Sequence, residues 1–116
     1  MPHFIVDCSK NVLAIRSPEE ILRGIHDAAE ATGLFRKNDL KVRIRPFELF
    51  YNGENNPDFI HVFANILEGR TVEQKANLSK QIVTKLKKMF TDVPIISMNV
   101  REFERATYTN RNLIED

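Results

Sequence analysis

The hydrophobic positions of this chain follow two periods, one of two residues and one close to 3.6 residues. A period of two, or a short run of β-branched and aromatic residues, is typical of a strand. These patterns predict four strands, over residues 3–8, 40–51, 59–67 and 95–103. Pro46 indicates a bulge or a sheet edge in the second strand because it lacks a backbone N–H. Both faces of the third strand are apolar enough to be covered.

Two amphipathic helices are predicted between these strands. Residues 17–20 and 71–74 each have the pattern of a capping box, in which Ser or Thr is followed three residues later by Glu or Gln. Pro18 suits the first helical turn, where its missing N–H leaves no hydrogen bond unmade. Apolar residues then recur at intervals of three and four, as on the buried stripe of a helix. Gly33 and Pro94 predict where the two helices stop.

The order is therefore β-α-β followed by β-α-β, an internal pseudo-repeat of residues 2–52 and 57–104 within a single domain of residues 1–116. Crossovers between parallel strands are right-handed, which places both helices on the same side. The predicted fold class is α/β, in the form of an α+β two-layer sandwich: a four-stranded mixed sheet with two helices on one face. The other face stays open, and its apolar residues predict burial against further copies of the chain.

Composition narrows the classes of function. With 17 Lys and Arg against 16 Asp and Glu, the net charge of +1 lacks the electrostatic footprint of a dedicated nucleic-acid binder. The single cysteine, Cys8, excludes an internal disulfide and is expected to be a buried, inert thiol, while three scattered histidines predict no metal site. No apolar run reaches the roughly 20 residues that span a bilayer, and Asp7 comes too early for a signal peptide. We expect a cytoplasmic protein that binds neither nucleic acid nor membrane.

Basic residues are the first candidates for binding chemistry. Lys41, Arg43 and Arg45 share one face of a strand. Such a row is either a solvated strand face or a site for an anion with more than one carboxylate. Arg70, just before the second helix, is either a surface turn residue or a further part of that anion site.

Pro2 is the candidate for proton transfer. Methionine before a small residue is commonly trimmed, and removal of Met1 would leave Pro2 as a terminal secondary amine. Burial and nearby cations would both lower the pKa of this amine, so that it could take up a proton beside a carbonyl and return it elsewhere. The cations would stabilise the enolate charge that develops. A retained Met1 would instead make the Pro2 nitrogen an amide, which is no base.

The opening residues Met1-Pro2-His3-Phe4-Ile5-Val6-Asp7-Cys8-Ser9 resemble the start of the 5-carboxymethyl-2-hydroxymuconate isomerases, a family of the tautomerase superfamily. The resemblance covers most of the chain up to about Phe103, and its further motifs are Ala31-Thr32-Gly33, Lys41-Val42-Arg43, Phe59-Ile60-His61-Val62 and Gly69-Arg70-Thr71. Relatives in the superfamily include 4-oxalocrotonate tautomerase and macrophage migration inhibitory factor, which share the doubled β-α-β plan.

The resemblance implies an isomerase that uses no cofactor or metal, forms a homotrimer with its sheets facing inward, and ketonises a carboxylated 2-hydroxymuconate-type dienol. Pro2 matches the catalytic proline of the family, and its substrate-binding basic positions match Lys41, Arg43 and Arg70. Lys41 stands where the family has arginine, and Arg45 where it has histidine. These departures keep open an alternative, a repurposed family member that binds a small ligand or another protein.

Overall fold

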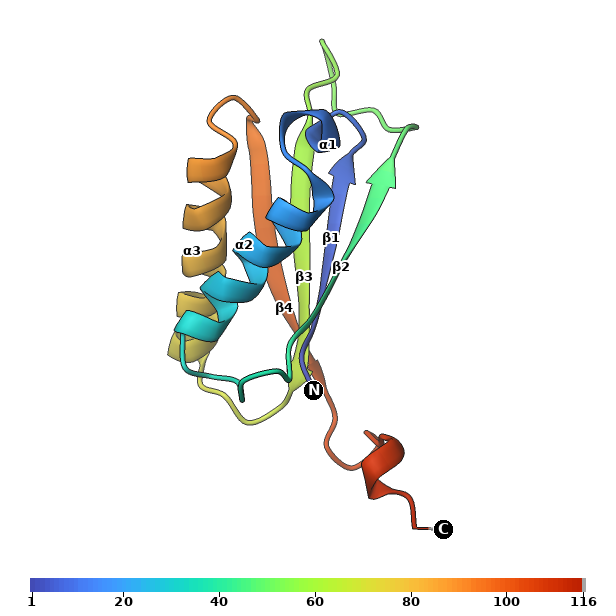
Figure 1. Cartoon of the computed structure of the whole chain (residues 1–116), viewed down its shortest axis with the longest axis vertical. Helices are drawn as coiled ribbons and strands as arrows, with labels where there is room; N and C mark the ends of the chain where they lie inside the picture. The colour runs from blue at the N-terminus through green and yellow to red at the C-terminus, as the bar shows by residue number, and fades with distance from the viewer. Residues whose placement is uncertain (116) are drawn as a thin grey trace.

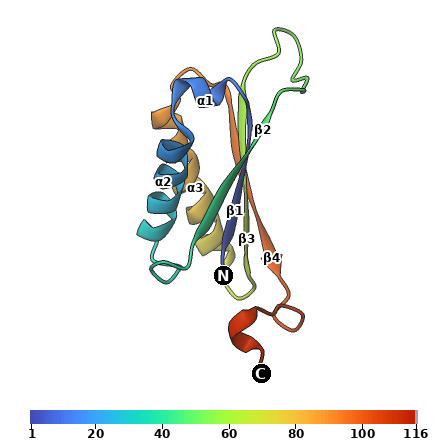
Figure 2. The ribbon, with the colours of Figure 1, turned by 45° about the vertical axis from the view of Figure 1, so that its right-hand side comes forward.

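The structure is a computed structural model that describes residues 1–115. Its elements in chain order are β1 (His3–Ser9), α1 (Val12–Ile15), α2 (Pro18–Ala31), β2 (Lys41–Phe47), β3 (Phe59–Leu67), α3 (Val72–Met89), β4 (Ile95–Phe103) and the 3-10 helix η1 (Arg111–Leu113). Figures 1 and 2 show α2 and α3 together on one face of a four-stranded sheet, with the other face uncovered. This arrangement confirms the predicted two-layer fold.

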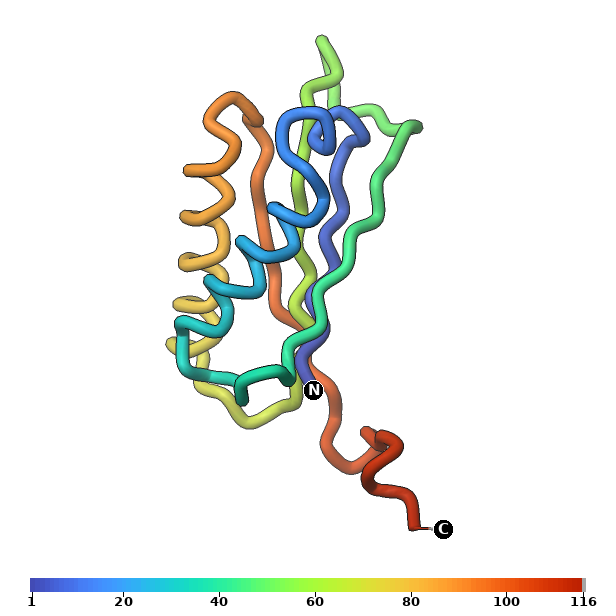
Figure 3. Tube along the Cα trace, viewed as in Figure 1, coloured from blue at the N-terminus to red at the C-terminus, as the bar shows by residue number. Residues whose placement is uncertain are grey.

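The sheet has the strand order β2-β1-β3-β4 and is mixed. β1 pairs in parallel with β2, β3 pairs in parallel with β4, and the central pair β1 and β3 is antiparallel. His3 at the start of β1 is therefore in register with Lys41 at the start of β2 and with Asn65 near the end of β3. The starts of β1 and β2 and the ends of β3 and β4 meet at one edge, which we call the Pro2 edge. Figure 3 shows the N-terminus at this edge, beside the segment that leaves β4.

Both long helices begin as the sequence predicts. The Ser17 hydroxyl accepts a hydrogen bond from the backbone N–H of Glu20 at 3.2 Å, and the Glu20 carboxylate accepts one from the backbone N–H of Ser17 at 3.4 Å. Thr71 and Gln74 form the same reciprocal pair at 3.1 and 2.9 Å. The boxes satisfy backbone N–H groups that a helix start leaves without partners. α3 ends at Met89, five residues before Pro94, because Phe90 leaves the helical conformation and buries its ring.

The core lies between the sheet and the two helices. Its largest fully buried side chains come from β1, α1, α2, β3, α3 and the residue that follows α3: Phe4, Phe90, Ile21, Ile25, Ile60, Ile66, Leu78, Ile82, Leu86, Val6, Val12 and Val62. Cys8 is also buried, with 1% of its surface exposed, as the sequence predicts. Burial raises the pKa of its thiol to about 11, since a thiolate is poorly solvated there.

The structure corrects the sequence expectations at three further places. β2 ends at Phe47 rather than at residue 51, although Pro46 does lie in an edge strand as expected. The expectation that both faces of β3 are covered is wrong within this chain, because the helices bury only alternate residues and leave the others half-exposed. The short elements α1 and η1 have no counterpart among the predicted helices.

Candidate functional site

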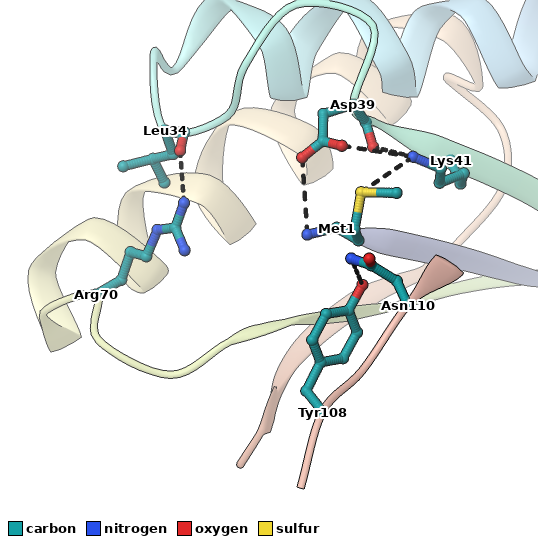
Figure 4. A network of polar contacts seen from close by, with 7 residues as sticks. All are labelled: Met1, Leu34, Asp39, Lys41, Arg70, Tyr108 and Asn110. Carbon is teal, nitrogen blue, oxygen red and sulfur yellow. Dashed lines mark hydrogen bonds and ion pairs between the residues drawn. The ribbon is translucent and has the colours of Figure 1, made fainter. Parts of the chain in front are cut away.

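A cavity of about 660 Å³ opens at the Pro2 edge. Four segments line it: the chain start with Pro2, the connection from α2 to β2, the turn from β3 to α3, and the segment that follows β4. They meet here because of the strand directions, which bring two strand starts and two strand ends to the same edge. Its volume is within the range of about 300–1,000 Å³ typical of small-molecule sites. Figure 4 shows polar contacts around this cavity.

Pro2 is buried at the cavity wall, and Met1, which is half-buried, lines the same cavity. The terminal ammonium of Met1 is 3.6 Å from Oδ2 of Asp39. The Nζ of Lys41 donates to the backbone carbonyl of Asp39 at 2.7 Å and lies 3.6 Å from the Met1 sulfur, as Figure 4 shows. With Met1 in place, the Pro2 nitrogen is a tertiary amide. Removal of Met1 would create an amine at the cavity wall, close to one carboxylate and one ammonium group.

Arg70 is anchored to the connection from α2 to β2. Its Nη2 donates to the backbone carbonyl of Leu34 at 2.7 Å, and its guanidinium carbon lies 5.3 Å from the centroid of the Phe35 ring. Phe35 in turn packs edge-on against the buried ring of Phe4 at 5.9 Å. Gly69 precedes Arg70 with a φ of 120°, a conformation that favours glycine. These contacts hold the guanidinium in one place and leave further N–H groups for a ligand.

The three cationic side chains of β2 do not form one site. Lys41 lies beside Met1 at the Pro2 edge, whereas the guanidinium of Arg43 is on the open sheet face, 3.1 Å from Nδ1 of His3. Arg45, further along the strand, makes two hydrogen bonds to the carboxylate of Asp7 at 2.7 and 3.2 Å. Of the predicted site residues, Pro2 and Arg70 line the cavity. Lys41 lies at the Pro2 edge beside Met1 and Asp39 without lining the cavity, and Arg43 lies outside it.

The environment of His3 favours its neutral form. Burial lowers the pKa of His3, and the positive charges of Arg43, Lys41 and the N-terminus lower it further. A neutral His3 can accept a hydrogen bond at Nδ1 from the Arg43 guanidinium, which agrees with the short distance between them. The ring of His3 also lies edge-on to Phe103 at 6.2 Å.

Sequence reasoning missed the contribution of the segment after β4. Arg105, Tyr108 and Asn110 line the cavity, and so does Arg36 from the connection before β2. The Tyr108 ring stacks on Phe103 at 5.5 Å, and its hydroxyl accepts a hydrogen bond from Nδ2 of Asn110 at 3.2 Å (Figure 4). The signal was present in the predicted topology, because parallel strands end at the same edge and the residues that follow them must lie close together.

Residues 1–115 contain neither a candidate metal site nor a candidate membrane-spanning helix. No group of three or more His, Cys, Asp or Glu side chains among them could hold a metal ion. None of the helices that the structure describes has the length and apolar character to cross a bilayer.

The fold places the chain in a class of small proteins with a mixed sheet covered by helices on one face. The fold is similar to that of a 5-carboxymethyl-2-hydroxymuconate isomerase from Deinococcus radiodurans R1, with a TM-score of 0.82, 20% sequence identity, and coverage of 95% of this chain and 88% of that chain. It is also similar to a fused 4-OT described as a symmetric trimer, with a TM-score of 0.79, 15% identity, and coverage of 97% and 94%.

The sequence assigns the chain to a particular family within this class. A sequence model of the 5-carboxymethyl-2-hydroxymuconate isomerase family matches residues 2–116, and the chain belongs to this family. A curated relative, the 5-carboxymethyl-2-hydroxymuconate Delta-isomerase of Escherichia coli, is 24% identical over 92 residues, which make up 78% of this chain and 73% of the relative. The chain is thus an isomerase by family, as its opening residues implied.

Proposed function

We propose that the chain, once Met1 is removed, ketonises a carboxylated 2-hydroxymuconate-type dienol with the Pro2 amine as general base and general acid. The observation that carries this proposal is the position of Pro2, buried in the wall of a cavity that also presents Arg70. Cofactor-free proton transfer needs little else: an amine beside the substrate and fixed cations where negative charge develops.

The proposed reaction moves one proton within the substrate. The amine of Pro2 takes the proton of the 2-hydroxyl group, the oxygen becomes a carbonyl, and the conjugated electron pairs shift along the chain. The amine then returns the proton to a carbon further along the conjugated system, so that no atom is gained or lost. Arg70 and Lys41 are suited to bind carboxylate and enolate oxygens at the Pro2 edge, and Lys41 offers a point charge rather than a fork.

We propose that the chain works as a homotrimer in the cytoplasm, with the open sheet face turned toward neighbouring subunits. Half-buried aromatic residues on this face, including Phe63 and Phe103, support an assembly that covers them. Within such an assembly Arg43 lies where it could reach a neighbouring subunit, and a substrate-binding role for Arg43 is proposed only in that form. The symmetric trimer described for the fused 4-OT supports the same arrangement.

A second candidate function is binding without turnover. One observation favours it: while Met1 is present, its ammonium group is held near Asp39 and the Pro2 nitrogen cannot accept a proton. A chain that keeps Met1 would retain the cavity and its cations but lack the base. The two functions therefore differ in the processing of the N-terminus.

The test is ultraviolet-monitored ketonisation of 2-hydroxymuconate by protein whose intact mass shows that Met1 has been removed. We expect turnover, and a loss of about 100- to 10,000-fold in kcat for Pro2→Ala, which is the range for a general acid–base residue. Size-exclusion chromatography and melting curves of the variant should match the wild type. A form that keeps Met1 is the matched control and should be inactive. Turnover by Pro2→Ala at the wild-type rate would contradict the mechanism.

A further inference from the structure

The cavity at the Pro2 edge holds more positive charge than the proposed proton transfer requires. Arg36, Arg70 and Arg105 line it, whereas Asp39 supplies a carboxylate that already faces the N-terminus and Lys41. Within residues 1–115 no carboxylate lies within 4.0 Å of any of these three guanidinium groups. Unpaired guanidinium groups around one cavity favour an anionic ligand.

Of the six arginines outside the cavity, three have a carboxylate partner in the described part of the chain. Arg16 and Arg23 pair with carboxylates on α2, Arg45 pairs with Asp7, and Arg101 lies over the Phe63 ring at 4.1 Å. Arg43, Arg101 and Arg111 have no carboxylate within 4.0 Å among residues 1–115. The cavity is distinguished by the gathering of three such guanidinium groups, those of Arg36, Arg70 and Arg105, in one lining.

Arg105 is the cavity arginine whose anchoring resembles that of Arg70. Its Nη2 donates to the backbone carbonyl of Glu68 at 3.1 Å, and its backbone N–H donates to the Glu68 carboxylate at 2.5 Å. The carboxylate of Glu68 is thus directed at the main chain. Gly69 lies directly beside this contact, because a Cβ atom at that position would be 3.7 Å from Nη2 of Arg105.

The two anchored guanidinium groups flank the same glycine turn. Arg70 uses Nη2 on the Leu34 carbonyl, and Arg105 uses Nη2 on the Glu68 carbonyl, so each keeps other N–H groups for a ligand. Parallel pairing of β3 and β4 fixes this proximity, since the Glu68 N–H donates to the carbonyl of Phe103 at 3.1 Å. Each planar guanidinium suits one carboxylate, so the pair suits a ligand with two.

We infer that Arg105 binds a second carboxylate of the substrate and so determines the preference of the cavity for dienols with two or more carboxylates. The inference rests on the proposed function for the reaction that the substrate undergoes. The binding of a second carboxylate by Arg105 does not depend on that reaction. A substrate with one carboxylate would bind Arg70 and make no ion pair with Arg105. Arg105 is therefore a specificity residue, and its loss should change discrimination between anions more than it changes the chemical step.

The test compares two anions that differ by one carboxylate, cis,cis-muconate and sorbate, on the processed protein. Calorimetry should show that Arg105→Ala weakens muconate binding by about 10- to 100-fold and sorbate binding by less than about threefold, in keeping with the loss of a charged hydrogen bond. Arg111→Ala is the matched control, since Arg111 is exposed in the same segment but does not line the cavity. It should leave both affinities unchanged. Arg105→Gln, which keeps a polar side chain but removes the positive charge, should reproduce the loss.

Two results would overturn the inference: a muconate-to-sorbate affinity ratio that Arg105→Ala leaves unchanged, whether or not both affinities fall, or no muconate binding by the wild type. Failure of the proposed function has a different signature. In that case the wild type prefers muconate and Arg105→Ala abolishes the preference, yet no 2-hydroxymuconate is ketonised. If turnover is present, KM for 2-hydroxymuconate should rise in Arg105→Ala by the same factor as the muconate affinity falls, with kcat within about threefold of wild type.

Discussion

Replacing Arg70 with lysine separates the charge of this residue from its shape. Lysine keeps one positive charge but cannot donate to the Leu34 carbonyl at 2.7 Å and still present a planar fork to a carboxylate. A hydrogen bond from a charged donor contributes about 1.5–3 kcal/mol, and the stacking on Phe35 about 0.5–1 kcal/mol. Lysine recovers part of both, so we expect a fall of about 1–2 kcal/mol in the free energy of unfolding.

The same substitution should lower kcat/KM for 2-hydroxymuconate about tenfold, which corresponds to about 1.4 kcal/mol of lost transition-state binding. The assays are steady-state kinetics and urea denaturation of the processed protein. Arg23→Lys is the control, because Arg23 makes only an exposed ion pair with Glu19 at 3.2 Å and should tolerate the change in both assays. Lower stability with unchanged kcat/KM would refute the substrate-binding role of Arg70 and leave its anchoring role. If neither quantity changed, both roles would be refuted.

Two further predictions concern His3 and Cys8. Because its surroundings lower the pKa of His3 below 6.5, the unfolded chain binds a proton more readily than the folded one, and the free energy of unfolding should fall as the pH drops below about 6.5. Urea denaturation at pH 8, 6 and 5 should show a smaller fall in the free energy of unfolding for His3→Gln than for the wild type. The same dependence on pH in both proteins would contradict this. The Cys8 thiol is 1% exposed and its pKa is raised to about 11. It should therefore react with Ellman's reagent in urea but hardly at all in the native protein. Rapid labelling of the native protein would show that Cys8 is accessible.

The fold could be predicted from the sequence to a large extent because its signals are local. The capping boxes at Ser17 and Thr71 depend on residues three positions apart, and the strand β4 depends on the pattern within nine residues. The end of α3 could not be predicted this way. It is set by Phe90, which leaves the helix to bury its ring in a core that many distant residues share.

The candidate site was predicted in part. Pro2 and Arg70 were identified by their place at the chain start and in the Gly69-Arg70-Thr71 turn, and both line the cavity. Alternation along one strand groups Arg43 with Lys41, but a strand advances about 3.3 Å per residue, so Arg43 lies beyond the edge where the cavity opens. The predicted homotrimer and pseudo-repeat stay predictions.

By itself, the sequence determined the order and type of the elements, the two-layer fold and the family, because each follows from short-range patterns or from motifs that can be read directly. Only the tertiary structure decided which charged groups share a cavity. Arg105 lies 103 residues from Pro2 along the chain, and nothing in its neighbourhood in the sequence marks it as functional. The parallel pairing of β3 with β4 and the antiparallel pairing of β3 with β1 bring the two residues to one edge, since strand direction fixes where each strand begins and ends.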